Sequence, residues 1–275
     1  MSRPAYPGRP ETVEMSVDLE PRANTNTPTL PLHDRIVLWT ALTGLTVLSW
    51  LYLIRMPMAP ADLGEFGECF LSVLPPRWTD TSLIFMMWTV MMVAMMIPSA
   101  APMMAMYSRI ARSRQMPPLA GWVFISAYIV VWTAFSALAT AAQIGLEHAS
   151  LISPSLSAGP FAGAVILALA GVYQLSPLKE VCLGHCRSPL GFLMAEWREG
   201  IPGAFFMGLR HGAFCVGCCW MLMLLLFVLG VMNLLWVAIL SALILLEKAS
   251  RHGRGIARAA GVAMIVAAAA VVFRV

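Results

Sequence analysis

A dense run of methionines offers the first chemistry in this 275-residue chain. Nine of its 20 methionines lie between Met86 and Met106. Residues three or four positions apart share a helix face, so the run predicts two parallel stripes along one helix. Thioether sulfur is a soft ligand that suits Cu(I), and it has no proton to release. The ligands that we predict from the stripes are Met91, Met92, Met95, Met96 and Met103.

Methionine is also a flexible filler of helix cores, which is the simpler interpretation of the stripes. Pro98 and Pro102 lie within the same run. Each proline lacks an N–H and clashes with the carbonyl four residues before it, which frees the carbonyls of Ala94 and Pro98. The prolines predict either a packing kink or a widened helix that opens a binding cavity beside Met95 and Met96.

Five of the six cysteines lie between Cys182 and Cys219, in two groups. The first group supplies the predicted ligands Cys182, His185 and Cys186, in a segment that we assign to a cytoplasmic loop. Thiols stay reduced in the cytosol, where clustered cysteines are more often metal ligands or catalytic groups than disulfides. The residue order differs from the C-x-x-C-H sequence of c-type haem attachment, so haem is not predicted.

The second group lies in a long apolar segment. His211, Cys215, Cys219 and Met223 recur every four residues, so a helix places all four on one face, with Cys218 on a neighbouring face. An imidazole, thiolates and a thioether together form a set of metal ligands. Cysteine is also a common small buried residue. Three cysteines in five positions, in register with a histidine and a methionine, favour the metal site.

The composition indicates that a membrane positions these residues. Hydrophobic residues make up 59% of the chain and charged residues 12%, against about 25% charged in soluble domains. The apolar runs are about as long as the 20 residues that a helix needs to cross a bilayer, and they do not alternate as barrel strands do. We therefore predict an all-α, polytopic transmembrane helix bundle with about seven spans, or six. The seven cover residues 36–54, 83–107, 119–142, 161–175, 204–231, 234–246 and 256–273.

The distribution of charge predicts the topology. Residues 1–34 are polar and rich in proline, which is typical of a disordered tail, and residues 35–275 form the transmembrane metal-binding domain. With the tail in the cytoplasm, 15 of the 18 Lys and Arg residues lie on the cytoplasmic side, as membrane proteins favour. The net charge of +4 is explained in this way and not by a nucleic-acid surface. Glu247 and Lys248 end the sixth span, and we interpret them as an interfacial pair.

At these residues the chain resembles a bacterial family of integral membrane proteins that are described as metal-binding and often labelled membrane copper chaperones. The resemblance rests on ordered motifs between about residues 80 and 250. These motifs are MMVAMMIPSAAP at 91–102, LKEVCLGHCRSP at 178–189, GLRHG at 208–212, CVGCCWMLM at 215–223, GVMN at 230–233 and EK at 247–248. The resemblance implies a bacterial inner-membrane protein that binds copper and delivers it to a copper enzyme.

The leading hypothesis is an integral membrane protein that binds Cu(I) and takes up, holds or delivers it to a copper enzyme, without catalysing a reaction. Its partners would be the bilayer, the metal ion and that enzyme, with no nucleic acid. One alternative is an enzyme, a membrane thiol–disulfide oxidoreductase that uses the clustered cysteines. Another is a structural subunit of a membrane complex, with the methionine stripes as packing surface. Zinc is the alternative metal at the Cys and His residues, but it leaves the thioether stripes unexplained.

Overall fold

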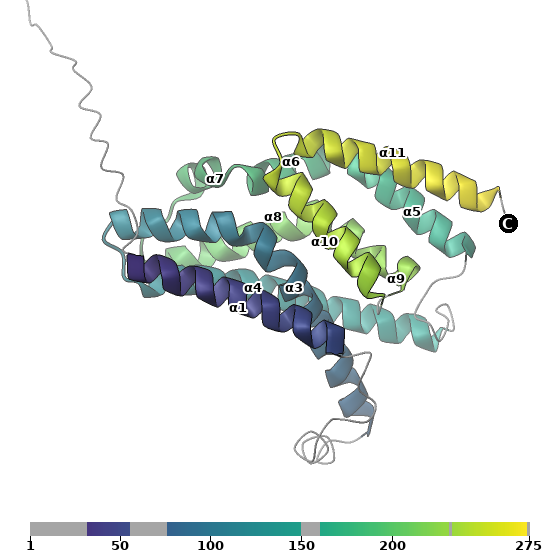
Figure 1. Cartoon of the computed structure of the whole chain (residues 1–275), viewed down its shortest axis with the longest axis horizontal. Helices are drawn as coiled ribbons and strands as arrows, with labels where there is room; N and C mark the ends of the chain where they lie inside the picture. Colours follow the sequence, from purple (N-terminus) through teal and green to yellow (C-terminus); the bar gives the residue numbers. More distant parts are fainter. Residues whose placement is uncertain (1–31, 56–75, 150–159, 231–232, 274–275) are drawn as a thin grey trace, which may run out of the picture.

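The computed structural model describes residues 32–55, 76–149, 160–230 and 233–273. Every regular element in these ranges is an α-helix, which confirms the predicted all-α class. The helices are α1 (Leu32–Arg55), α3 (Pro76–Ser113), α4 (Leu119–His148), α5 (Pro160–Gln174), α6 (Pro177–Arg187), α7 (Pro189–Glu196), α8 (Gly200–Leu224), α9 (Leu226–Leu229), α10 (Leu234–Ala249) and α11 (Gly253–Val272) (Figure 1). The predicted disordered tail lies outside the described residues except at positions 32–34, which already belong to α1.

Five of these helical segments are long and apolar enough to cross a membrane. They are Leu32–Arg55, Thr81–Ser113, Leu119–Leu146, Gly200–Leu229 and Gly253–Val272. A sixth span is formed if α5 and α6, which meet at a bend of 62°, are counted together. The described parts of all seven predicted segments are mainly helical, but α10 has only 16 residues. At 1.5 Å per residue it is about 24 Å long, shorter than a hydrocarbon core of about 30 Å. The number of spans is therefore five or six.

Close packing at glycines holds pairs of helices together. Figure 1 shows α5 and α11 running side by side, and Gly171 and Gly261 lie where they meet. A Cβ built on Gly171 would lie 2.7 Å from the Gly261 carbonyl oxygen, and one on Gly261 would lie 2.9 Å from that of Gly171. Small residues that let two backbones approach are the usual basis of helix association in membranes. The same device joins α4 to α8 at Gly208.

Replacing Gly208 with alanine is expected to destabilise the protein by about 1–3 kcal/mol, the usual cost of overpacking a tight core. The added Cβ would lie 2.8 Å from the Ala127 Cβ and closer still to the Phe124 carbonyl oxygen, so the two helix backbones would have to separate. Gly145→Ala is the matched control, because no described neighbour lies within 4 Å of its Cβ position. The control should be neutral or up to about 1 kcal/mol more stable. Unfolding in detergent measures both, and equal stabilities would contradict the packing argument.

The methionine helix α3 continues through both of its prolines. Figure 1 shows that α3 changes direction along its length. The Ala94 carbonyl, which Pro98 deprives of its helical partner, accepts a hydrogen bond from the Trp50 indole nitrogen at 3.3 Å. This contact confirms the predicted freed carbonyl at Ala94, and it fastens α1 to α3 because a carbonyl inside a bilayer must find a donor.

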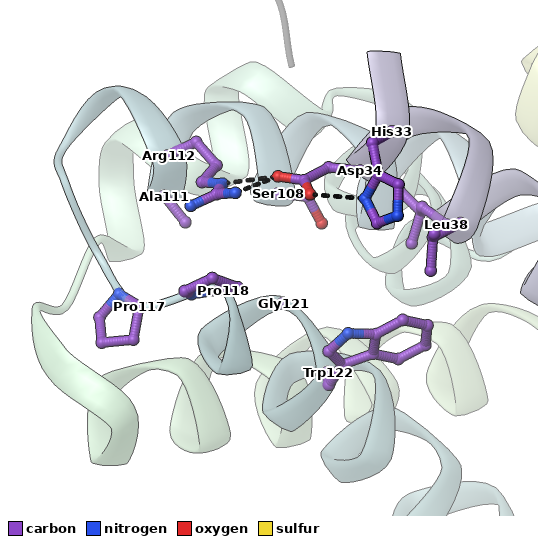
Figure 2. A pocket seen from close by; sticks show the side chains of 11 residues that line it. His33, Asp34, Leu38, Ser108, Ala111, Arg112, Pro117, Pro118, Gly121 and Trp122 are labelled. Carbon is purple, nitrogen blue, oxygen red and sulfur yellow. Dashed lines mark hydrogen bonds and ion pairs between the residues drawn. The ribbon is translucent and has the colours of Figure 1, made fainter. Parts of the chain in front are cut away.

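A cavity of about 220 Å³ with a mainly apolar lining lies where the start of α1 meets the end of α3 and the start of α4 (Figure 2). Asp34 on α1 forms an ion pair with Arg112 on α3 inside it, and His33 Nδ1 lies 3.6 Å from the Asp34 carboxylate. No cysteine or methionine is among the residues that line this cavity. Its chemistry is therefore separate from that of the soft ligands.

The end of α3 is also held to the segment that precedes α8. The Trp197 indole and the Arg114 guanidinium both donate to Glu199, at 2.7 and 2.8 Å. These two donors hold the pKa of the Glu199 carboxyl below its usual range. The start of α1, the end of α3 and the start of α8 therefore lie at one end of the bundle.

Candidate metal centre

The buried face of α8 carries the second cysteine group. His211, Cys215, Cys219 and Met223 are each at most 2% exposed, and they lie in one uninterrupted helix. The predicted helical face is thus confirmed. Cys218, placed by the sequence on a neighbouring face, is also buried.

The segment that carries Cys182, His185 and Cys186 is helical, so the predicted loop is wrong. Residues 177–187 form α6, which packs against α8. Ser176 caps this helix, because its hydroxyl oxygen accepts from the Lys179 backbone N–H at 3.2 Å, and proline occupies the first helical position. In this helix Cys186 is buried, and its Sγ lies 3.9 Å from Cys218 Sγ. Cys182, partly exposed, lies against α8 at Gly217, where a Cβ would lie 2.9 Å from its sulfur.

The methionine helix reaches the same place. Met96 Sδ lies 3.9 Å from Cys219 Sγ. The other predicted ligands of α3 are buried within the bundle: Met91, Met92, Met95 and Met103. We call Cys186, Cys215, Cys218, Cys219 and Met96 the thiol cluster. It joins sulfur atoms from three helices that are far apart in the sequence.

The cysteines of the thiol cluster are free thiols with hydrogen-bond partners. The Cys218 and Cys219 thiols both donate to the Cys215 carbonyl, at 3.1 and 2.8 Å. A thiolate has no proton to donate, so these two bonds exist only while the cysteines are protonated. Loss of the protons would release both sulfurs from the Cys215 carbonyl and let them turn towards an ion.

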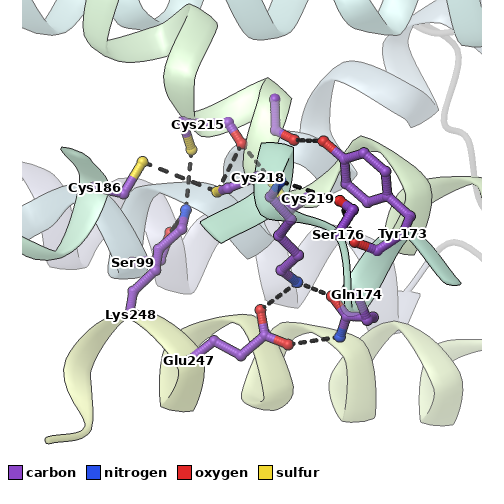
Figure 3. Close-up of polar contacts among 12 residues, drawn as sticks. Ser99, Tyr173, Gln174, Ser176, Cys186, Cys215, Cys218, Cys219, Glu247 and Lys248 are labelled. Atoms are coloured by element: carbon purple, nitrogen blue, oxygen red, sulfur yellow. Dashed lines mark hydrogen bonds and ion pairs between the residues drawn. The ribbon is translucent and has the colours of Figure 1, made fainter. Parts of the chain in front are cut away.

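Lys248 is part of this site, and the sequence analysis missed it. Its Nζ lies 3.0 Å from Cys215 Sγ and 3.1 Å from Ser99 Oγ (Figure 3). The Tyr128 hydroxyl lies 3.1 Å from the same sulfur. The interpretation of Glu247 and Lys248 as an interfacial pair is wrong, since they are only 2% and 9% exposed. An ammonium group beside a thiol stabilises the thiolate, the form that binds metals.

Glu247 turns to a different buried partner. Its carboxylate lies 2.7 Å from Lys179 Nζ on α6 and accepts a hydrogen bond from the Gln174 side-chain nitrogen at 2.8 Å. The Gln174 side-chain oxygen in turn accepts from Lys179 Nζ (Figure 3). Two consecutive residues of α10 thus make different contacts: Glu247 ties α10 to α5 and α6, and Lys248 reaches the thiol cluster. A spacing signal existed, because Leu240, Ile244 and Lys248 recur every four residues and all three are buried.

The two predicted histidine ligands have different surroundings. His211 is enclosed by the rings of Phe124, Tyr128 and Phe192, and its buried Nδ1 makes no hydrogen bond within the described residues. A buried polar atom of this kind calls for an explanation, such as a ligand. His185 is partly exposed and does not join the thiol cluster.

The arrangement suits a soft ion held by few ligands. In the described ranges, no three His, Cys, Asp or Glu side chains converge into a metal site of those residue types. The close pairs are thiol with thiol and thiol with thioether, both at 3.9 Å. Metal–thiolate bonds are about 2.3 Å long for zinc, so two sulfurs at this separation can share one ion. Thiolates and thioethers are the ligands that select Cu(I).

A comparison with known families agrees with this chemistry. The family model described as PpoB2 copper chaperone matches residues 85–271. The chain belongs to this copper chaperone family. The matched region contains the methionine run of α3 together with α6, α8 and α10, whose side chains meet at the thiol cluster. Membership of this family confirms the resemblance found in the motifs. It is also consistent with a role other than catalysis. Neither the curated proteins nor the solved structures contain a match to the chain.

Proposed function

We propose that this protein holds Cu(I) within the bilayer at the thiol cluster and delivers it to a copper enzyme. One observation carries the proposal: the Cys186–Cys218 and Cys219–Met96 contacts bring sulfurs from α3, α6 and α8 into one buried cluster. The ion would move by exchange between ligands, so no reaction is catalysed. The other proposed ligands of the buried ion are Met91, Met92, Met95, Met103, His211 and Met223, and Cys182 and His185 are proposed to bind the ion only in transit.

Copper fits this set better than zinc does. Structural zinc sites take four nitrogen, oxygen or thiolate ligands in a tetrahedron, whereas the ligands at hand are paired and include a thioether. A cuprous ion with two thiolates carries one negative charge, which the Lys248 ammonium beside Cys215 would balance. Burial of a charge without such a partner is costly, so Lys248 supports a bis-thiolate Cu(I) site.

We further propose that the protein lies in a bacterial inner membrane with its N-terminus in the cytoplasm. The Arg112–Asp34 and Arg114–Glu199 ion pairs place three segments that the charge rule assigns to the cytoplasm at one end of the bundle. Met91 and Met92, which precede Met96 on α3, would then extend from the thiol cluster towards the opposite side. They would form the continuation of the copper path.

Metal content tests the function. Protein purified anaerobically in detergent would be loaded with Cu(I) or Zn²⁺, freed of weakly bound ion and assayed for metal per chain. We expect the native protein to retain Cu(I). Two double variants should lose it: Cys215→Ser combined with Cys219→Ser, and Met91→Leu combined with Met95→Leu. Met116→Leu is the matched control, because Met116 is buried in the turn after α3 and distant in sequence from the stripes.

Two results would contradict the proposal. If the native protein retains no Cu(I), the methionine stripes serve helix packing and not copper binding. A stable disulfide between Cys186 and Cys218 in cells, detected by alkylation and mass spectrometry, would favour the thiol–disulfide oxidoreductase instead.

A further inference from the structure

An open groove of about 410 Å³ lies on α6, the helix that carries Cys186, between this helix, α7 and the start of α11. Its lining includes Glu180, His185, Ser188, Phe192 and Arg254. Small-molecule sites in proteins have volumes of about 300–1,000 Å³, so a small ligand fits the groove. The histidine in its wall is one of the predicted metal ligands.

The His185 ring is oriented as metal-binding histidines are. Its Nδ1 lies 2.9 Å from the Val181 carbonyl oxygen, and because a carbonyl only accepts, Nδ1 carries the proton. The lone pair is therefore on Nε2. The ring stacks on Phe214 at 4.2 Å between centroids, with 4° between the planes. A carbonyl that fixes the tautomer and a ring that fixes the orientation are the usual support of a metal ligand.

Thiols connect this histidine with the interior. Cys182 precedes His185 by one helical turn and is partly exposed, and Cys186 follows it and is buried. The Cys186 thiol in turn reaches Cys218 at 3.9 Å. The order His185, Cys186, Cys218 thus leads from the groove to the thiol cluster with falling exposure, along α6 and its neighbour α8.

The rim of the groove is positively charged. Arg254 and Arg258 lie 3.3 and 3.4 Å from the Glu180 carboxylate, which is the acidic partner of both. Arg187 donates to the carbonyls of Ser250 and Arg251, which ties the end of α6 to the start of α11. Three arginine side chains against one glutamate leave a surplus of positive charge at this place. A basic rim attracts anions and raises their local concentration.

We propose that Cu(I) enters and leaves the thiol cluster through this groove as an anionic complex with two small thiolates, and that His185 Nε2 is its first protein ligand. The inference rests on the proposed function. In the exchange Cu(SR)₂⁻ meets two protein thiols, two Cu–S bonds to the small thiol break and two to cysteines form. The two cysteine protons pass to the leaving thiolates as RSH. Copper stays Cu(I), and the charge on its complex stays at −1.

His185→Phe tests the entry ligand, because phenylalanine keeps the stacking on Phe214 and removes the nitrogen. Detergent-purified protein would be mixed with the Cu(I) complex of glutathione, an anionic thiol, and the rate and final extent of loading measured. We expect loading to slow by roughly tenfold or more, with the final copper content unchanged. Equal rates in the native and variant proteins would overturn the proposal. A native protein that takes up no copper would instead refute the proposed function.

The charge of the complex is tested separately with Arg254→Glu. Loading from the glutathione complex should slow by about tenfold at low salt, and loading from the Cu(I) complex of cysteamine, a cationic thiol, should not slow. The difference should vanish at 1 M salt, where the Debye length is about 3 Å. Arg109→Glu is the control, since it makes the same change of charge at an exposed position on α3. If Arg254→Glu slows loading equally from the glutathione and cysteamine complexes, or if Arg109→Glu slows loading as much, the anionic complex is not the substrate.

Discussion

Replacing Cys218 with serine is expected to weaken the binding of Cu(I) by roughly 100-fold or more, since loss of even an outer-shell partner costs about 10–100-fold. Cys218 faces Cys186 at 3.9 Å, and it is the residue of α8 that links α6 to the thiol cluster. Serine keeps the size of the side chain and a hydrogen bond to the Cys215 carbonyl. It offers a hard oxygen in place of soft sulfur, so the fold should persist while the copper is lost.

Cys182→Ser is the matched control for this prediction. Cys182 lies on the same helix as Cys186, but it is partly exposed and outside the thiol cluster. Its replacement should leave the equilibrium affinity unchanged, even if the rate of loading changes. An anaerobic titration against a competing Cu(I) chelator measures both affinities, and the unfolding of the copper-free proteins shows whether each variant is folded. Equal Cu(I) affinities for the two variants would show that Cys218 is not a copper ligand.

Local periodicity predicted the parts of the site that lie within one helix. The four-residue spacing of His211, Cys215 and Cys219 required only that α8 be helical, and its buried face followed. The proline positions similarly predicted a freed carbonyl at Ala94, which Trp50 now satisfies. Predictions of this kind hold because hydrogen bonding inside a bilayer leaves an apolar segment few alternatives to a helix.

The contacts between helices could not be obtained in this way. α6 is short and carries charged residues, so its sequence resembled a loop, although Ser176 followed by Pro177 is a typical helix start. The burial of Lys248 depends on what α10 faces, and only the packing shows that Cys215 and Ser99 lie there. Charged residues at the end of an apolar segment are equally compatible with an interface and with a site.

Replacing Glu247 with alanine is expected to destabilise the protein by roughly 3–5 kcal/mol, the usual cost of removing one partner of a buried ion pair. Lys179 and Glu247 are 1% and 2% exposed, and their charged atoms lie 2.7 Å apart. Without the carboxylate, the Lys179 ammonium would stay buried with the Gln174 side-chain oxygen as its remaining acceptor. Denaturation of the copper-free protein in mixed detergent micelles measures the change. A variant as stable as the native protein would show that Lys179 reaches water when its partner is lost.

The double variant Lys179→Met with Glu247→Leu separates stability from positioning. Replacement of both charges by apolar groups of similar size removes the desolvation cost along with the attraction, and such changes are often neutral or stabilising. We therefore expect the double variant to recover most of the stability that Glu247→Ala loses. Because Glu247 fixes α10 against α6 and its neighbour Lys248 contacts Cys215, the affinity for Cu(I) should still fall. Recovery of both stability and affinity would mean that helix packing alone positions Lys248. Recovery of stability without affinity would mean that the buried ion pair sets the position of the ammonium at the thiol cluster.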